Sequence, residues 1–372
     1  MHAKRSGTSV FVLLALFGCG PSVPPANGVV PGPVAAAAHA AGPTFHVFTA
    51  GSTPGLPARA VPRDVVVAAD GTAWFTDAQR PAIGSISTHL KVREFTAGLN
   101  AGALPYDIVN GPDGNVWFSD GAGSIGRVTP AGQIAEFRTP HADVADPAAL
   151  TVGSDGALWT IAVGPPSYLV RATVEGRVSS FRVPRDLIPD GSIEADGSGN
   201  LWFFASLTDH EVVLVQSSIH GSFLVHSTGL VTKGEPCCAN LSPNHIAIGS
   251  DGNPWFTLPY FGLPSEDGQL VGTFAAGQPV FYHVARNVIT FPVYPSGIAS
   301  GVRALWFSGS DPIGTNGAVW RITTAGKQQA YPIPYNPAGF AIAPDQRTLW
   351  FTSQVQGRAP QIVEASFEGV HQ

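Results

Sequence analysis

The sequence is poor in charged residues, which make up 12% of its 372 residues, about half the usual share. The charges that exist lean acidic, with 26 acidic and 20 basic residues and a formal net charge of −6. A nucleic-acid-binding surface needs a basic stripe with aromatic residues beside it, so we expect no nucleic-acid partner. The chain has a single methionine but 43 Gly and 33 Pro. This balance favours short β-strands joined by many turns over helices.

Long hydrophobic runs are also missing. The longest apolar run near the start covers the eight residues 10–17, well short of the ~20 residues that span a bilayer. It follows the basic pair Lys4-Arg5 and precedes Gly18-Cys19. This order predicts a lipoprotein-type signal peptide over 1–19 with lipidation of Cys19. An ordinary signal peptide with an incidental Cys is the alternative. We therefore expect an exported protein, periplasmic or at the cell surface, that meets the membrane only through this anchor.

Cysteine is scarce, with three residues in the whole chain. Besides Cys19, only the adjacent pair Cys237 and Cys238 remains, so no metal site built on Cys spacing is expected. Two free or buried thiols and one strained disulfide are both compatible with this pair. Residues 20–43 are rich in Pro and Ala and carry no charge, which predicts a tether between the anchor and a domain over 44–372.

A repeat dominates that domain. A Trp, usually followed by Phe and preceded by an Asp-Gly-like pair, recurs 42–53 residues apart along the chain. The seven copies carry Trp74, Trp117, Trp159, Trp202, Trp255, Trp306 and Trp350. Periods of this length indicate a solenoid, a propeller or a similar array.

Each repeat unit reads as four short strands. A Pro opens the unit, an Asp-Gly turn leads into the Trp-Phe strand, and two further strands follow, as in 125–129 and 134–140. Four strands per unit predict an all-β fold, a seven-bladed β-propeller of four-stranded antiparallel blades. The last unit offers only three strands, the third near 361–367, and the segment 44–50 resembles a missing fourth. We expect this N-terminal strand to close the ring and each Trp to pack between blades.

One face of such a propeller collects the variable loops. In a four-strand meander, the segments before each opening Pro lie on the same face as the loops after each Trp-Phe. Three of these segments are long, namely 229–242, 257–269 and 308–318. Function usually sits on variable loops over a rigid scaffold, so we predict a small-molecule or peptide ligand at this face of the central funnel, bound by a monomer.

Polar residues recur on the same face at equal offsets. Asp64 follows an opening Pro and Asp77 follows the first Trp-Phe, and Asp107 and Asp120 repeat this arrangement in the second unit. Four carboxylates on adjacent blades could hold a hard cation such as magnesium or calcium. They could equally accept hydrogen bonds from backbone amides at strand ends.

The fifth unit carries Asn244 and His245 beside the long loops. An imidazole titrates near neutral pH, so His245 is the best candidate for a general base, although a structural histidine is the more common case. We expect four residues at this face to bind the ligand: Arg63, Tyr106, Asn244 and Tyr260.

The repeat, best seen in 105–137, resembles that of the virginiamycin B lyases, also called streptogramin B lyases. The resemblance covers about 44–368. It implies a seven-bladed propeller and a magnesium-dependent elimination that opens the ester-closed ring of a streptogramin B antibiotic. It also implies a catalytic His directly after an opening Pro, with Glu residues nearby. None of the seven residues at that position is His, and His245 stands one place further on, so no catalytic residue is carried over.

Two functions therefore stay open. The first is a metal-dependent carbon–oxygen lyase acting on a small ligand in the funnel. The second is a non-catalytic propeller, resembling the NHL-type binding propellers, that holds a peptide, glycan or protein partner at the cell envelope.

Overall fold

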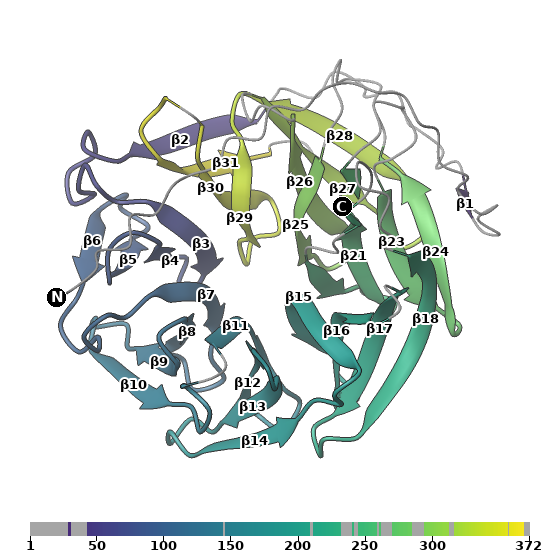
Figure 1. Cartoon of the computed structure of the whole chain (residues 1–372). Coiled ribbons are helices and arrows are strands. Elements are labelled where there is room, and N and C mark those ends of the chain that lie inside the picture. The colour runs from purple at the N-terminus through teal and green to yellow at the C-terminus, as the bar shows by residue number, and fades with distance from the viewer. Residues whose placement is uncertain are drawn as a thin grey trace, which may run out of the picture.

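The computed structural model describes residues 29–30, 43–143, 146–208, 211–231, 240–241, 245–258, 260–261, 270–284, 294–311, 316–355 and 357–367. The predicted lipidation site Cys19 and the pair Cys237 and Cys238 lie outside these residues. Within them every regular element is a β-strand, and the strands form seven blades arranged in a ring (Figure 1). No helix of the described ranges is long and apolar enough to cross a membrane.

Each blade is a four-stranded antiparallel meander whose first strand faces the ring axis (Figure 1). The inner strands are β3 (Pro62–Val67), β7 (Pro105–Asn110), β11 (Asp146–Val152), β15 (Leu187–Ala195), β20 (Ile246–Ile248), β25 (Tyr294–Ser300) and β29 (Pro337–Ile342). The second strands, which carry the repeated Trp, are β4 (Ala73–Asp77), β8 (Val116–Asp120), β12 (Leu158–Val163), β16 (Asn200–Leu207), β21 (Pro254–Leu258), β26 (Leu305–Ser310) and β30 (Thr348–Ser353).

The third and fourth strands complete each blade outward. The third strands are β5 (Ile83–Ile86), β9 (Ser124–Val128), β13 (Tyr168–Ala172), β17 (Glu211–Ser218), β23 (Leu270–Ala275), β27 (Gly317–Ile322) and β31 (Gln361–Ser366). The fourth strands are β6 (Val92–Phe95), β10 (Ile134–Arg138), β14 (Val178–Arg182), β18 (Phe223–Val231), β24 (Gln278–His283), β28 (Gln328–Ile333) and β2 (Thr44–Thr49). Consecutive inner strands touch one another, and β29 touches β3, which closes the ring.

The N-terminal strand completes the last blade, as expected from the sequence. All six residues of β2 pair with β31 in antiparallel register, from Thr44 opposite Ser366 to Thr49 opposite Gln361. This pairing removes the free edges of both segments. Within the predicted tether, the short strand β1 (Val29–Val30) pairs in parallel with β24, on the outer edge of blade five.

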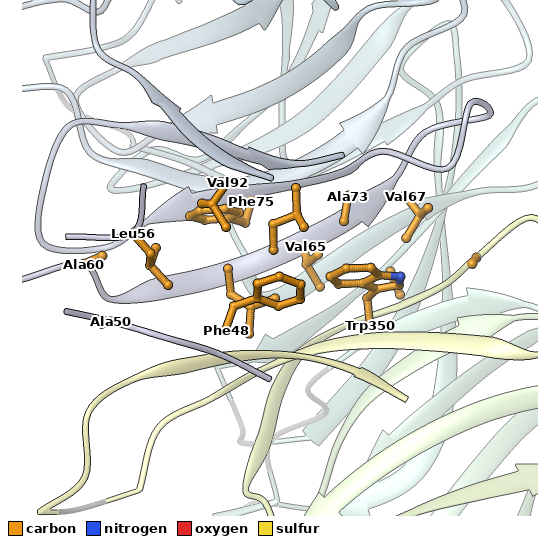
Figure 2. Close-up of a cluster of buried hydrophobic side chains, with 14 residues drawn as sticks. Phe48, Ala50, Leu56, Ala60, Val65, Val67, Ala73, Phe75, Val92 and Trp350 are labelled. Atoms are coloured by element: carbon orange, nitrogen blue, oxygen red, sulfur yellow. The ribbon is translucent and has the colours of Figure 1, made fainter. Parts of the chain in front are cut away.

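The repeated Trp residues are buried, as the sequence predicts. Each one stacks on a ring from the outer strand of its own blade, with ring centroids 5.6–5.9 Å apart in all seven cases. In the last blade the partner of Trp350 is Phe48 from β2, and Figure 2 shows both rings in the hydrophobic cluster between blades seven and one. Stacking inside a closely packed interior stabilises each blade and its contact with the next.

Two of the long segments meet. The strand β19 (Asn240–Leu241) precedes blade five, and β22 (Tyr260–Phe261) follows its Trp-Phe strand. They pair as a small antiparallel sheet, with Leu241 opposite Tyr260. In blade one, the opening Pro62 likewise pairs with Asp77, the last residue of the Trp strand. The backbone of Tyr260 therefore lies on the same loop face as the opening Pro positions.

Candidate functional site

A β-bulge interrupts the inner strand of six blades at the same place. The register shifts lie between Pro62 and Val65, Pro105 and Ile108, Pro147 and Leu150, Asp190 and Ile193, Pro295 and Ile298, and Pro337 and Phe340. The two residues inside each shift, here called the bulge pair, are freed from the ladder and their side chains are re-aimed. The bulge pairs of blades one and two are Arg63-Asp64 and Tyr106-Asp107.

His245 directly precedes the paired part of the inner strand in blade five, where the other blades have their second bulge residue. Pairing in that blade resumes with Ile246 opposite Phe256, as it does with Val65 opposite Phe75 in blade one. His245 is therefore the structural equivalent of Asp64 and Asp107. The first position of that pair, the predicted ligand-binding residue Asn244, lies outside the described residues.

The bulge carboxylates bind the inner edge of the following blade. Asp64 Oδ2 accepts a hydrogen bond from the backbone N–H of Ile108 at 3.2 Å, and Asp107 Oδ2 accepts one from Leu150 N–H at 2.6 Å. In blade four the hydroxyl of Ser192 accepts from Ile246 N–H at 2.7 Å. An inner strand exposes one row of backbone groups to the axis, and these side chains satisfy part of that row.

Asp64 and Asp107 also face each other. Burial among the inner strands raises the pKa of Asp64 well above its usual value, and the negative charge of Asp107 raises it further. Two carboxyl groups this close favour a shared proton, and burial favours the protonated form of Asp64.

Glu194 is a titratable group that the sequence reasoning missed. It lies two residues beyond Ser192 on β15, and its Oε2 accepts a hydrogen bond from the hydroxyl of Thr151 at 3.3 Å. Burial raises its pKa to about 8, and the charge of Asp107 acts in the same direction. Burial likewise raises the pKa of Asp190, on the same strand, to about 6. No local sequence motif identifies these residues, because only the register between neighbouring blades brings Glu194 near Asp107.

One ring nitrogen of His245 has a hydrogen-bond partner among the described residues. Its Nδ1 lies 3.1 Å from the carbonyl oxygen of Ser296. A carbonyl can only accept, so Nδ1 carries the proton and Nε2 is left as the basic nitrogen. Solvent reaches part of this residue, yet the surrounding strands lower its pKa by burial, while the charge of Asp107 works against that shift. His245 is therefore neutral at pH 7, the form that can accept a proton.

Arg63 and Tyr106 lie together above the carboxylates. The guanidinium of Arg63 stands 3.4 Å from the ring centroid of Tyr106, in a cation–π arrangement across blades one and two. Tyr106 is 41% exposed. This stacked pair combines a cation and an aromatic ring, and ligand binding by Arg63 and Tyr106 stays a prediction.

Asp77 and Asp120 have a different place. Asp77 Oδ1 accepts from the N–H groups of Val61, Gln79 and Arg80, at 3.0–3.2 Å. Asp120 Oδ1 accepts in the same way from Leu104 and Ala122. Both residues are buried and fix the loops at the ends of their strands. The four predicted metal-ligating carboxylates thus split into an axial pair, Asp64 and Asp107, and a loop-binding pair.

The second oxygens of the loop-binding pair are buried without a hydrogen-bond partner in the described ranges. Each faces a similarly orphaned Glu oxygen on the outer strand of its blade, Glu94 for Asp77 and Glu136 for Asp120. Burial raises the pKa of both Glu residues, and the charge of the neighbouring Asp adds to the shift.

A metal would find carboxylate oxygens at the axis. No three His, Cys, Asp or Glu side chains of the described ranges come together as a metal-binding group. Magnesium, however, often takes only one or two carboxylates and keeps several waters. Asp64 and Asp107 supply hard oxygen donors, and the excess negative charge that raises the pKa of Asp64 is what a cation would neutralise. The donor set therefore fits such an ion.

The virginiamycin B lyase family model matches residues 49–218, from the end of β2 to the end of β17. Over these residues the chain is similar to the virginiamycin B lyase family. Blades five to seven lie outside the matched range. The search of curated proteins gave no match.

Solved structures share the propeller fold of this chain. Virginiamycin B lyase from Staphylococcus aureus is 21% identical with a TM-score of 0.66, covering 87% of this chain and 99% of that chain. A catalytically inactive variant of the enzyme with quinupristin is 23% identical over the same shares, with the same TM-score. YCF48 bound to a D1 peptide is 10% identical with a TM-score of 0.60, covering 88% of this chain and 97% of that chain. These identities show a common fold and leave the activity to the site itself.

Proposed function

We propose that this propeller binds a small ester-containing ligand at the loop face and opens it by acid–base elimination. The observation that carries the proposal is His245, a neutral histidine with a free Nε2 in the bulge position equivalent to Asp64 and Asp107. The likeness to virginiamycin B lyases supports the choice of reaction.

Elimination removes a proton from the carbon beside a carbonyl and breaks the neighbouring C–O bond, leaving a double bond and a carboxylate. Nε2 of His245 would accept the proton. Arg63, in the bulge pair with Asp64, would hold the carboxylate that forms, and Tyr106 keeps its guanidinium in place. Asp64 and Asp107 would hold a magnesium ion, which polarises a carbonyl when bound.

Incubation with quinupristin tests this function. Elimination gives a ring-opened isomer of unchanged mass, whereas hydrolysis adds one water, so chromatography with mass detection separates the two reactions. We expect the isomer to form with magnesium, to be lost in His245→Gln, and to persist in His220→Gln, which changes an exposed histidine of an outer turn. No turnover by the wild-type protein would retire the lyase function for this substrate.

A second candidate is a non-catalytic propeller that holds a peptide, glycan or protein partner at the same face. Its support is the missing His directly after each opening Pro, together with the peptide complex of YCF48, which shares the fold. In this case wild-type and His245→Gln proteins would retain a ligand equally well without converting it. Deletion of 258–268 should abolish capture, and unchanged capture would place the ligand elsewhere.

We further propose export and lipid anchoring through Cys19. Metabolic labelling with a palmitate analogue should mark the full-length protein and leave Cys19→Ser unlabelled. Labelling of both proteins, or of neither, would contradict the lipoprotein assignment.

A further inference from the structure

A pocket of about 370 Å³ lies between blades seven and one, on the face of the Asp-Gly turns, opposite the bulge pairs. This volume is in the range of small-molecule sites. The residues that matter for its chemistry are Asp70, Ser87, Leu90, Asp345, Trp350 and Glu364. It is separate from the axial site and does not depend on the proposed lyase function.

The pocket exists because one turn departs from the repeat. In four blades the turn between the third and fourth strands places a Gly against an aromatic ring of the preceding blade. A Cβ there would lie only 2.0–2.3 Å from the ring. The pairs are Gly132 on Phe95, Gly176 on Phe137, Gly221 on Phe181 and Gly326 on Tyr282. Blade one has Leu90 at this turn position, with a φ of 58°, as shown by the same turn hydrogen bonds. A Leu side chain cannot enter the space that Gly leaves, so this turn stands away from Phe48 and Trp350.

A hydrogen-bond donor faces the opening. In four blades the indole N–H donates to an Asp of the first turn at 2.9–3.2 Å, as Trp117 does to Asp113. The indole of Trp350 donates to no acceptor among the described residues, although Trp350 is only 4% exposed and lines the pocket. In Figure 2 its nitrogen lies at the end of the ring nearest Val67, another lining residue.

The reason lies in the turn of blade seven. Gly111, Gly153 and Gly249 lie against the indoles of their blades, where a Cβ would come within 2.7 Å of Nε1, whereas blade seven has Ala343 at this position. Asp345 is also five residues before its Trp, whereas Asp113, Asp155 and Asp251 are four before theirs. Its oxygens accept from Arg347 N–H, Thr348 N–H and the Thr348 hydroxyl.

The remaining polar groups of the pocket are mainly acidic. Asp70, Asp345 and Glu364 contribute carboxylates, Ser87 contributes a hydroxyl, and no Lys or Arg lines the pocket. Among the described residues, His46 pairs with Glu364 Oε2 at 2.8 Å, and the positive charge of Arg347 acts on Asp345. A ligand that fits must be cationic, and it must offer an oxygen to the indole N–H.

We propose that this pocket binds small organic ammonium compounds that carry hydroxyl groups, of which amino sugars are the simplest. The ammonium group would lie among the carboxylates of Asp70, Asp345 and Glu364, and a hydroxyl oxygen would accept from the indole N–H of Trp350. Uncharged sugars of the same size lack the ammonium group and would leave the carboxylates unpaired.

Indole N–H resonances measured by NMR on the ¹⁵N-labelled protein test this site, with Trp350→Phe identifying the Trp350 signal. Glucosamine should shift that signal saturably in the millimolar range, and glucose should leave it unchanged. Asp70→Asn should weaken glucosamine binding several-fold, while Glu175→Asn, which removes an exposed acid from an outer turn of blade three, should not. Leu90→Gly should let the turn approach Phe48 and abolish the shift.

Three results would overturn the proposal. The first is no saturable shift with glucosamine. The second is an equal shift with glucose, which would show that the carboxylates are not used. The third is a shift caused by calcium alone, which would make the pocket a metal site. Because the indole signals of the other blades report folding independently, a misfolded variant is recognised, and Asp70→Asn then carries the test in place of Leu90→Gly.

Discussion

Asp64 and Asp107 accept hydrogen bonds from the same backbone N–H. The amide of Ile108 lies 3.2 Å from Asp64 Oδ2 and 2.9 Å from Asp107 Oδ1. Two carboxyl groups from adjacent blades are thus held together at the axis by one donor, and His245 and Glu194 both sense the charge of Asp107.

Replacing Asp107 should shift the titration of His245. The negative charge of Asp107 raises the pKa of the imidazole against the effect of burial, so Asp107→Asn should lower that pKa further. The proton NMR signals of the His245 ring, followed against pH, measure it. Asp143→Asn, at an exposed site in blade two, is the control, and an unchanged or higher His245 midpoint in Asp107→Asn would contradict the coupling.

Glu194 should make the protein less stable as the pH rises. Its pKa is about 8 in the folded protein against an ordinary 4.5, so the folded state binds more protons than the unfolded state between these values. Its contribution is complete below about pH 4.5 and is lost as the pH rises through about 8. Glu194→Gln should reduce the fall of the unfolding free energy with pH by at most about 1.4 kcal/mol per pH unit, less where solvent screens the group. Urea unfolding at several pH values measures it, and parallel slopes would refute the assignment.

Asp120 offers two substitutions with opposite outcomes. Asp120→Ala removes the acceptor of Leu104 N–H and Ala122 N–H and should cost about 2–4 kcal/mol of unfolding free energy. Asp120→Asn keeps that acceptor and offers an amide donor to Oε1 of Glu136, which has no partner among the described residues. It should therefore be neutral or stabilising by about 1 kcal/mol at pH 7. Thermal and urea unfolding distinguish the two, and equal destabilisation would show that the carboxylate charge itself is required.

The glycine contacts between blades can be separated from backbone strain. Gly132 and Gly114 both have positive φ, 84° and 77°, but a Cβ on Gly132 would strike Phe95 at 2.0 Å, whereas Gly114 has open space. Gly114→Ala should cost about 1 kcal/mol from backbone strain alone. Gly132→Ala should cost about 1–3 kcal/mol more, because the turn must move off Phe95. Equal costs in urea unfolding would mean that the interblade contact is loose.

The closing strand should be essential to stability. Phe48 on β2 is 5% exposed and stacks on Trp350, so Phe48→Ala should cost about 3–5 kcal/mol. Val47, the residue before Phe48, is 38% exposed, and Val47→Ala should change stability by less than about 1 kcal/mol. Calorimetric unfolding compares them directly, and a small effect of Phe48→Ala would mean that β2 adds little to the ring.

The blade architecture was predictable because it repeats. Every unit carries its own Trp, turn and opening Pro, so each copy confirmed the others, and the incomplete last unit identified β2 as its fourth strand. The same offsets predicted the positions of Arg63 and Tyr106. They also predicted the four carboxylates of blades one and two, namely Asp64, Asp77, Asp107 and Asp120.

The placement of the titratable side chains around the ring axis could not be predicted from the repeat in this way. His245 is equivalent to Asp64 only once the bulges are counted, and Glu194 reaches the cluster through the register between blades. Both depend on long-range geometry that no local pattern encodes. The turn at Leu90, in contrast, lacks the repeated Gly in the sequence itself, but its effect on the pocket depends on Trp350, 260 residues further along the chain.

The pairing of β2 with β31 also sets an order of events during synthesis. His46 and Glu364 are 318 positions apart, so β2 leaves the ribosome long before its partner strand exists. Blades one to six can each pair their strands soon after they emerge, but the seventh stays incomplete until the last strand is made. The pairing of β2 with β31 closes the longest loop of the chain, so we expect it to form last. Until it forms, the rings of Phe48 and Trp350 are exposed apolar surface that chaperones or other nascent chains can bind.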